Sequence, residues 1–271
     1  MATIDLDVSP RAASSKRSDR MVAIISSLGE RGSASFADLA TELGVSAATI
    51  RRDLADLEDQ GLLARTHGGA RAFTSAAEVP VGLRDSQFRL AKQLIARRAA
   101  TLLPDGPYAI AIGGGTTAAG VARALMFRTD LTIVTNSLTT ATEIASRPNI
   151  KVIMTGGVIR SQSFELVGAL AENAFNAINV GTAILGMDGI GSVGGATTHD
   201  ETEARTNTAM VRHAQRVIVV ADSSKVGRVT LAKVADLTEI HDLVTDSGAD
   251  PDELARIRDR GVRVHVVEVA E

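Results

Sequence analysis

Residues 46–54 read SAATIRRDL, and they follow the segment FADLATELGV at residues 36–45. In the earlier segment the apolar residues recur at helical spacing and fall on one face of a short helix: Phe36, Leu39, Ala40 and Leu43. Gly44 suits the left-handed conformation that ends a helix. Ser46 is a favourable N-cap for a second helix. The two segments therefore predict a pair of short helices joined by a tight glycine turn.

The second helix has a buried stripe and an open face. Ile50, Leu54 and Leu57 form the stripe, whereas Thr49, Arg51 and Arg52 lie off it on the first turns. In a helix-turn-helix this end of the second helix enters the major groove of DNA. An ordinary helix pair with solvated arginines fits the same spacing, so geometry alone leaves both interpretations open.

The residues that follow favour DNA binding. Residues 62–66, LLART, are typical of a strand, and residues 67–71, HGGAR, are typical of a tight hairpin turn, or wing. We expect a winged helix-turn-helix whose DNA contacts come from the start of the second helix and from the wing. The candidate DNA-binding residues are Ser46, Thr49, Arg51, Arg52, Arg65 and His67.

At these motifs the chain resembles the DeoR family of bacterial transcriptional regulators. The resemblance lies in VS at residues 45–46, TIRRDL at residues 49–54 and HGGA at residues 67–70. It implies double-stranded operator DNA as a partner. One winged helix reads a short site, so we also expect two half-sites and a homo-oligomer, either a dimer or a tetramer.

Charge supports the DNA-binding interpretation only locally. The whole chain has a net charge of −3, and residues 17–72 contain seven basic and eight acidic side chains. The signs are segregated along the sequence: Arg51, Arg52, Arg65 and Arg71 belong to the helix start and wing, and Asp56, Glu58 and Asp59 to the far end of the helix. A local basic patch can contact phosphates without a high overall charge.

Composition bounds the class of protein. The chain of 271 residues is 45% hydrophobic and only 3% aromatic, which suits a parallel sheet flanked by helices. The absence of cysteine rules out disulfides and thiolate metal sites and is typical of a reducing cytoplasm. No apolar run reaches the roughly 18 residues of a membrane span, and residues 1–10 lack the apolar core of a signal peptide. We expect a cytoplasmic protein without a membrane partner.

The chain divides into four predicted regions. Residues 1–16 are expected to be a disordered tail, 17–72 the winged domain, 73–88 a linker, and 89–271 an α/β effector-sensing domain. In the last region strand-like and helical segments alternate, which predicts a mostly parallel sheet. The expected strands are 108–112, 131–135, 151–155, 182–186, 216–221, 243–245 and 262–267, and the expected helices are 117–126, 138–146, 201–213 and 252–260.

Small, hydroxyl or ionisable residues follow most of these strands. Ligands of open α/β sheets bind outside the carboxyl ends of the strands, so these residues are candidates for one effector site. A purely structural set of loops would also be rich in glycine and serine. The candidates at strand ends are Gly113, Gly114, Gly115, Thr116, Thr117, Asn136, Ser137, Gly156, Gly157, Asp188 and Lys225.

The glycine-rich turn at residues 113–117 predicts a phosphate site. A glycine turn that opens a helix presents free backbone N–H groups and a positive helix end to an anion. The turn lacks the Lys-Ser/Thr of a P-loop. It matches the dinucleotide fingerprint loosely, but Asn136 stands where an acidic residue would bind a ribose hydroxyl. We therefore favour a small phosphorylated ligand over NAD and expect no cofactor.

The same strand ends resemble the sensor domain of the DeoR family, which is similar in fold to ribose-5-phosphate isomerase. Members of the family mostly respond to phosphorylated sugars or related metabolites. The resemblance implies that residues 114–117 hold phosphate and that Asp188, Glu203 and Lys225 face the sugar. Many members carry Lys or Arg where this chain has Thr206, Asn207 and Thr208, a departure that bears on the identity of the ligand rather than its class.

Each of these polar residues also has a structural interpretation. Asp188 can belong to a simple turn, Glu203 can be an acid at a helix N-terminus, and Lys225 can be a solvated loop cation. His199 and Asp200 show no metal-binding spacing with another histidine, so we expect no metal. Without a Gly-x-Ser-x-Gly motif or a cysteine, the chain offers no nucleophile for hydrolysis. We therefore name no catalytic residue.

Three functions remain to be compared. The favoured one is a repressor of a sugar or carbohydrate catabolism operon that a phosphorylated sugar releases from DNA. The second is an active sugar-phosphate isomerase fused to a DNA-binding domain, because Asp188, Glu203 and Lys225 are capable of proton transfer. The third is an NADH-sensing repressor, which Asn136 disfavours.

Overall fold

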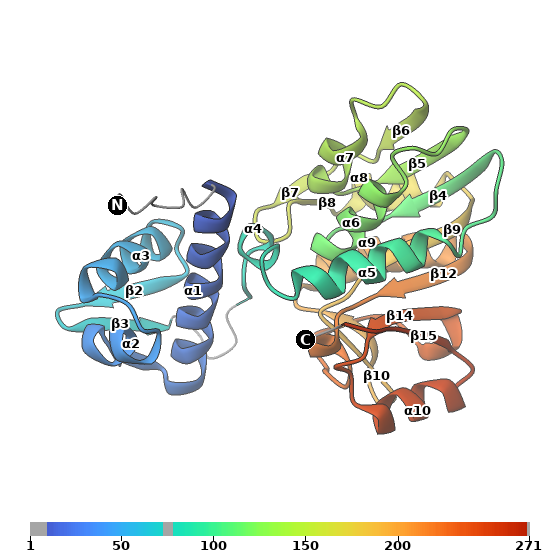
Figure 1. Cartoon of the computed structure of the whole chain (residues 1–271). Coiled ribbons are helices and arrows are strands. Elements are labelled where there is room, and N and C mark those ends of the chain that lie inside the picture. The colour runs from blue at the N-terminus through green and yellow to red at the C-terminus, as the bar shows by residue number, and fades with distance from the viewer. Residues whose placement is uncertain (1–9, 73–77, 270–271) are drawn as a thin grey trace, which may run out of the picture. The chain divides into compact units, whose positions relative to one another are not determined.

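The computed structural model describes residues 10–72 and 78–269, shown in Figure 1. The chain forms two compact units, which divide between Gln87 and Phe88. The first nine residues of the expected tail and residues 73–77 of the expected linker lie outside the described residues. The described part of these segments contains helices: α1, Pro10–Arg31, includes residues 10–16, and α4, Val81–Arg84, lies within the expected linker.

The first unit is a winged helix-turn-helix, as predicted. After α1 come β1 (Ser33–Ser35), α2 (Phe36–Glu42), α3 (Ala47–Asp59), β2 (Leu63–Thr66) and β3 (Gly69–Ala72). The three strands form an antiparallel sheet in the order β1-β3-β2, and the β2–β3 hairpin is the wing. Strand β1 was not predicted, because three residues are too few to show a period. A Cβ atom on Gly69 would lie 2.0 Å from the carbonyl oxygen of Ala34, so glycine is what lets β1 approach β3.

The predicted stripe forms the core of this unit. Leu39 of α2 and Ile50, Leu54 and Leu57 of α3 are fully buried, and they pack in one cluster with Ile24 of α1. Burying each of these side chains contributes about 1.5–3 kcal/mol to stability. The core thus fixes α3 by its apolar face and leaves the opposite face open.

Asp53 ties α1 to α3. This side chain is 2% exposed, and its carboxylate accepts hydrogen bonds from Arg20 Nε at 2.5 Å and from Arg17 Nε at 3.4 Å. The sequence motif that contains Asp53 therefore includes a structural residue as well as candidate DNA contacts.

The second unit is built on a seven-stranded sheet in the order β15-β14-β12-β9-β4-β5-β6, and all neighbouring strands are parallel. This confirms the predicted α/β domain. Two strands have the predicted bounds, β4 (Tyr108–Ile112) and β5 (Leu131–Thr135). The others agree within a few residues: β6 (Ile150–Met154), β9 (Val180–Gly186), β12 (Ala214–Val220), β14 (Asp242–Asp246) and β15 (Arg263–Val267).

Helices cover both faces of the sheet. They are α5 (Arg89–Ala100), α6 (Thr116–Ala124), α7 (Leu138–Ile144), α8 (Ala169–Asn176), α9 (Glu201–Arg212) and α10 (Pro251–Asp259). Side chains of one strand alternate between two cores. Ile110 and Ile112 of β4 pack with α5 and α6, whereas Ala111 packs in the cluster that holds α9 and α10. Burial on both faces explains why these strands are continuous apolar runs.

Several short elements were not predicted. Strands β7 (Val158–Arg160) and β8 (Glu165–Val167) form a hairpin, and β10 (Gly189–Gly191), β11 (Gly195–Thr198) and β13 (Ala232–Ala235) form a small antiparallel sheet. Each has three or four residues. The helix α8 was missed as well. Of these additions, β8 lies beside the carboxyl end of β5, because the N–H of Leu166 donates to the carbonyl oxygen of Asn136.

The order of the strands reverses between β4 and β9. From β4 the chain moves outward through β5 and β6, then returns to the other side of β4 and moves outward through β12, β14 and β15. Such a switch point opens a crevice at the carboxyl ends of the two strands, which is where open α/β sheets bind ligands. Among the described residues, no helix is long and apolar enough to cross a membrane.

Candidate functional site

At the switch point, the glycine turn that follows β4 lies against Gly186, the last residue of β9. The N–H of Gly113 donates to the carbonyl oxygen of Ile184 in β9 at 3.0 Å. A Cβ atom on Gly186 would lie 2.8 Å from the carbonyl oxygen of Gly114. Gly186 therefore permits the turn after β4 to lie against the end of β9.

Glu165 covers the amide of Gly114. The Oε1 atom of Glu165 accepts a hydrogen bond from the Gly114 N–H at 2.9 Å and another from Asn136 Nδ2 at 3.3 Å. A Cβ atom on Gly114 would lie 2.3 Å from the Glu165 carboxyl carbon. The turn was expected to offer this amide to phosphate, and here a carboxyl group of the same chain is bound to it.

A second carboxyl group lies beside the first. Both Glu165 and Glu203 are buried, and Glu203 interacts with Glu165 through charge and a hydrogen bond. Burial raises the pKa of Glu165 well above its usual range, and the neighbouring Glu203 raises it further. The raised pKa means that Glu165 keeps its proton to higher pH than a solvated glutamate does.

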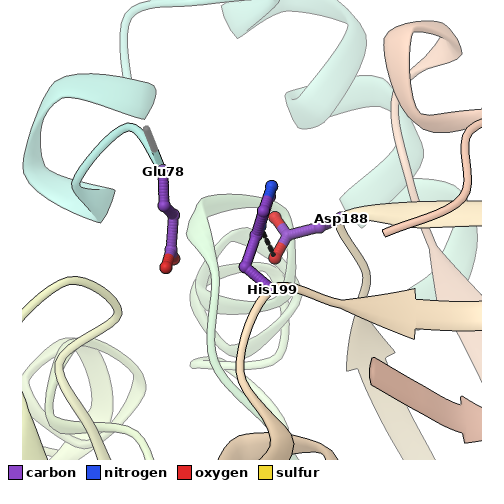
Figure 2. Close-up of side chains that lie close together, drawn as sticks. All are labelled: Glu78, Asp188 and His199. Atoms are coloured by element: carbon purple, nitrogen blue, oxygen red, sulfur yellow. Dashed lines mark hydrogen bonds and ion pairs between the residues drawn. The ribbon is translucent and has the colours of Figure 1, made fainter. Parts of the chain in front are cut away.

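Glu203 connects this pair to Asp188. Its Oε1 accepts a hydrogen bond from Thr198 Oγ1 at 2.5 Å, and Oγ1 of Thr198 also lies 3.0 Å from Asp188 Oδ2. Nδ1 of His199 is 2.8 Å from the same oxygen of Asp188. Figure 2 shows His199 turned toward Asp188, with this contact dashed. A chain of polar contacts thus runs from the turn after β4 to Asp188, two residues after the end of β9.

Arg160 supplies a positive charge to the network. Its Nη1 lies 3.1 Å from Glu203 Oε2, and its Nε lies 3.5 Å from Asp200 Oδ2. Asp200 is the N-cap of α9 and accepts from the N–H groups of Thr202 and Glu203, both at 2.9 Å. Although partial burial raises the pKa of Asp200, these N–H groups and Arg160 lower it overall.

The helix that follows the glycine turn begins without a side-chain cap. Gly115 is the N-cap of α6 with φ of 90°, a conformation that favours glycine. Thr116 is half-buried and Thr117 is buried. The first-turn N–H groups of a helix carry partial positive charge, so this end of α6 is suited to an anion. Ser137, by contrast, caps α7 by accepting from the Thr140 N–H at 3.2 Å.

Two buried amide oxygens near the turn have no hydrogen-bond donor among the described residues. They are Oδ1 of Asn136 and Oδ1 of Asn207. Asn136 is fully buried, and Asn207 Oδ1 lies 3.8 Å from where a Cβ atom on Gly113 would stand. Buried acceptors of this kind are normally satisfied by a donor, here a ligand hydroxyl or a water molecule.

The structure brings together some of the predicted effector residues. Five of them lie in the polar network or in the turn beside it: Gly113, Gly114, Asn136, Asp188 and Glu203. Packing explains the glycine at position 157, because a Cβ atom there would lie 2.8 Å from the Val167 carbonyl oxygen. Gly156 is exposed. Lys225 is half-buried in the single turn Ser223–Lys225 that follows β12.

Sequence reasoning missed Glu165 and Arg160. Both lie on the β7–β8 hairpin, which follows β6 but is not part of the seven-stranded sheet. Neither residue directly follows a strand of that sheet, where the sequence places its candidate residues. A charged residue inside the apolar-flanked segment FELV, residues 164–167, was the available signal for Glu165.

On the winged unit, the start of α3 is ordered by its cap. Ser46 Oγ accepts from the Thr49 N–H at 3.2 Å, and the two hydroxyl oxygens are 2.9 Å apart. Arg51 and Arg52 are exposed on the following turn, and the guanidinium of Arg51 lies 5.4 Å from the centre of the Phe36 ring. The predicted face is therefore open to a partner, with Ser46 also serving as the N-cap.

Arg65 differs from the expected arrangement. The sequence predicts it beside the arginines at the helix start and apart from Glu58, but its Nε lies 2.6 Å from Glu58 Oε2 and its backbone N–H donates to Glu58 Oε1 at 2.9 Å. The backbone N–H of Arg65, and then its side chain, lower the pKa of Glu58. The wing strand β2 lies against α3, which brings the two residues together. His67 is exposed in the turn of the wing.

Comparison with known protein families gives two matches that together cover most of the chain. The DeoR-like helix-turn-helix domain matches residues 20–76. The DeoR C terminal sensor domain matches residues 88–247. The two matched regions correspond to the winged unit and to most of the α/β unit.

Individual relatives match over nearly their whole length. A putative aga operon transcriptional repressor from Escherichia coli O157:H7 is 36% identical over 92% of this chain and 94% of its own. The HTH-type transcriptional regulator GlpR of Haloferax volcanii is 38% identical over 92% of this chain and 96% of its own. The glycerol-3-phosphate regulon repressor of Escherichia coli K12 is 32% identical over 86% of this chain and 92% of its own.

Similarity to solved structures is distant. Ribose 5-phosphate isomerase A of Methanocaldococcus jannaschii has a TM-score of 0.36 and 18% identity, over 49% of this chain and 52% of that one. The sorbitol operon regulator SorC of Klebsiella pneumoniae has a TM-score of 0.35 and 12% identity, over 77% of this chain and 89% of that one.

Proposed function

The chain belongs to the DeoR family of transcriptional regulators, and on that premise we propose that it represses a sugar or carbohydrate catabolism operon and leaves its operator when a phosphorylated sugar binds. Its family makes it a DNA-binding regulator rather than an enzyme. The names of two relatives, an aga operon repressor and a glycerol-3-phosphate regulon repressor, support the link to carbohydrate genes.

The observation that carries the proposal is the glycine turn at the switch point of the sheet. The uncapped start of α6 attracts an anion, and Asp188 and Glu203, which polar contacts connect to Gly114, offer carboxylate oxygens to sugar hydroxyls. We assign phosphate to Gly114, Gly115, Thr116 and Thr117. We assign the sugar to Asp188, Glu203 and Lys225, with Asn136 supplying an acceptor.

The proposal includes an assembly and a location. We infer a homo-oligomer, because a symmetric pair of α3 helices reads two half-sites and one alone reads too few base pairs for a specific operator. We place the protein in the cytoplasm, where operator DNA and sugar phosphates are both present. Within the chain we keep 17–72 as the DNA-binding domain, 73–88 as the linker and 89–271 as the sensor.

Direct binding distinguishes this function from the other two. The purified full-length protein is titrated by calorimetry with a panel of sugar phosphates, with the matching unphosphorylated sugars and with NADH. We expect saturable binding of at least one sugar phosphate, much weaker binding of its free sugar and no binding of NADH. Incubation with each bound sugar phosphate, followed by NMR, checks for turnover. Binding of NADH alone, or conversion of a sugar phosphate to its isomer, would contradict the proposal.

A further inference from the structure

Glu165 occupies the place at which an anion is expected. Its Oε1 accepts from the Gly114 N–H at 2.9 Å, immediately before the uncapped N-terminus of α6. The side chain comes from β8, 51 residues further along the chain, and is 2% exposed. A carboxylate and a phosphate oxygen seek the same N–H donor and the same positive helix end. Both cannot bind to the Gly114 amide at once.

The surroundings make Glu165 a weak occupant of this position. Glu203 is buried with it, and two carboxylates so placed cannot both remain ionised at low cost. A proton on the pair reduces the charge that Glu165 presents to the amide. A phosphate group that carries up to two negative charges then gains more from the same donor and helix end.

An independent observation shows that the polar network around this carboxyl is incomplete. Asn136, which donates to Glu165 Oε1, has its own oxygen buried without a donor among the described residues. Oδ1 of Asn207, near Gly113, is likewise buried without a hydrogen-bond donor among the described residues. A ligand with hydroxyl groups placed at this turn would supply the donors that both amide oxygens lack.

The main chain beside Glu165 is fixed. The N–H of Leu166 donates to the Asn136 carbonyl oxygen at 2.7 Å, and the N–H of Leu138 donates to the Phe164 carbonyl oxygen at 2.9 Å. Release of Gly114 therefore takes a rotation of the Glu165 side chain and not a movement of the strand.

We propose that the Glu165 carboxyl is a built-in competitor for the anion position at Gly114, so that an anionic effector group displaces it on binding. The inference rests on the proposed function for the identity of the effector, but not for the existence of the anion position. Released from the buried position beside Glu203 that raises its pKa, the displaced carboxyl ionises and its proton leaves the protein. Anion binding is then accompanied by release of a proton.

Sulfate is a suitable probe, because it is a dianion that does not titrate near neutral pH. Its binding to the full-length protein is measured by calorimetry for the wild type, for Glu165→Ala and for Glu172→Ala, an acid of α8 that serves as the control. A competitor that holds the position for 90–99% of the time weakens binding about 10–100-fold, so Glu165→Ala should bind sulfate at least about tenfold more tightly. The control should bind as the wild type does.

The proton provides a second readout, which does not depend on Glu165→Ala folding normally. The titration is repeated in two buffers of different ionisation enthalpy for the wild type and for Glu165→Gln, which keeps an acceptor oxygen but cannot release a proton. We expect proton release from the wild type and none from Glu165→Gln. Equal release from both proteins would overturn the inference, as would a folded Glu165→Ala that binds sulfate no better than the wild type.

These results are separable from the proposed function. Tighter sulfate binding by Glu165→Ala, combined with the failure of every sugar phosphate to bind, would leave the inference standing and refute the function. If a sugar phosphate instead binds the wild type and Glu165→Ala with equal affinity, the function would stand and the inference would be refuted.

Discussion

The guanidinium of Arg51 lies over the ring of Phe36, 5.4 Å from its centre, whereas its neighbour Arg52 is exposed on the same turn of α3. This stack joins the two helices of the helix-turn-helix and contributes about 0.5–1 kcal/mol at an exposed position. Arg51 is thus partly engaged within the protein. Arg52 is the cleaner probe of DNA contact.

Replacing Arg52 with alanine should weaken operator binding. If Arg52 contacts a base edge, we expect a loss of about 1–3 kcal/mol that relaxes specificity at one position. If it contacts phosphate only, the loss should be similar for all sequences, with a salt slope smaller by about one. Fluorescence anisotropy over a range of salt concentrations measures both quantities. Arg258→Ala, an exposed arginine of α10, is the control, and unchanged affinity and slope for both Arg51→Ala and Arg52→Ala would refute the assignment.

Asp53 should contribute to the stability of the winged unit and not to recognition of the DNA sequence. Asp53→Asn removes a buried charge that accepts from Arg20 and Arg17, so we expect the free energy of unfolding of the winged unit to fall by about 1–3 kcal/mol. Urea unfolding followed by circular dichroism measures this change. Asp59→Asn at the exposed end of α3 is the matched control, and an equal effect of the two substitutions would be evidence against the anchoring role.

Acid should destabilise the α/β unit through Asp242. Burial alone raises the pKa of this fully buried carboxyl, but hydrogen bonds from Arg216, His265 and Arg263 lower it to about 2, from a usual value of 3.8. Because the folded-state pKa is the lower one, the resulting stability is fully present above about pH 5 and is lost as the pH falls through 3.8 toward 2. The shift corresponds to about 2 kcal/mol.

The matching experiment compares the wild type with Asp242→Asn. At about pH 6 the variant should unfold at lower urea concentration, and the gap in unfolding free energy should narrow by about 2 kcal/mol as the pH approaches 2. A gap that stays constant over this range would show that Asp242 is not held ionised by its partners.

Much of the framework follows from local patterns. Gly44 and Ser46 mark the turn and the helix start because a left-handed residue and an N-cap are strong local signals, and Ser46 does cap α3. Strand β4 was predicted at its exact bounds because both its faces are buried and its ends carry turn residues. The strand order then places the predicted turn at residues 113–117 at the switch point of the sheet.

What sequence could not predict depends on contacts between distant residues. Glu165 reaches Gly114 across 51 residues, and Arg65 reaches Glu58 only because the wing lies against α3. Strands β7 and β8 have three residues each and are too short to show a strand period, so periodicity does not predict the hairpin that carries Glu165 and Arg160. These pairings arise from the packing of elements and not from spacing along the chain.

The proposed assembly has its own test. Light scattering of the full-length protein at micromolar concentration, with and without operator DNA, should give the mass of a dimer or a tetramer, because a repressor with one recognition helix per chain needs two copies on its operator. A monomer under both conditions would refute the homo-oligomer.

The most direct test is operator affinity in the presence of ligand. The dissociation constant of the full-length protein for its operator is measured alone, with a saturating sugar phosphate identified by calorimetry, and with the same sugar lacking phosphate. We predict that the sugar phosphate weakens operator binding by roughly 5–150-fold, the range of a typical coupling free energy, and that the free sugar does so far less. Operator affinity that no bound sugar phosphate changes, or that the free sugar changes equally, would contradict the proposal.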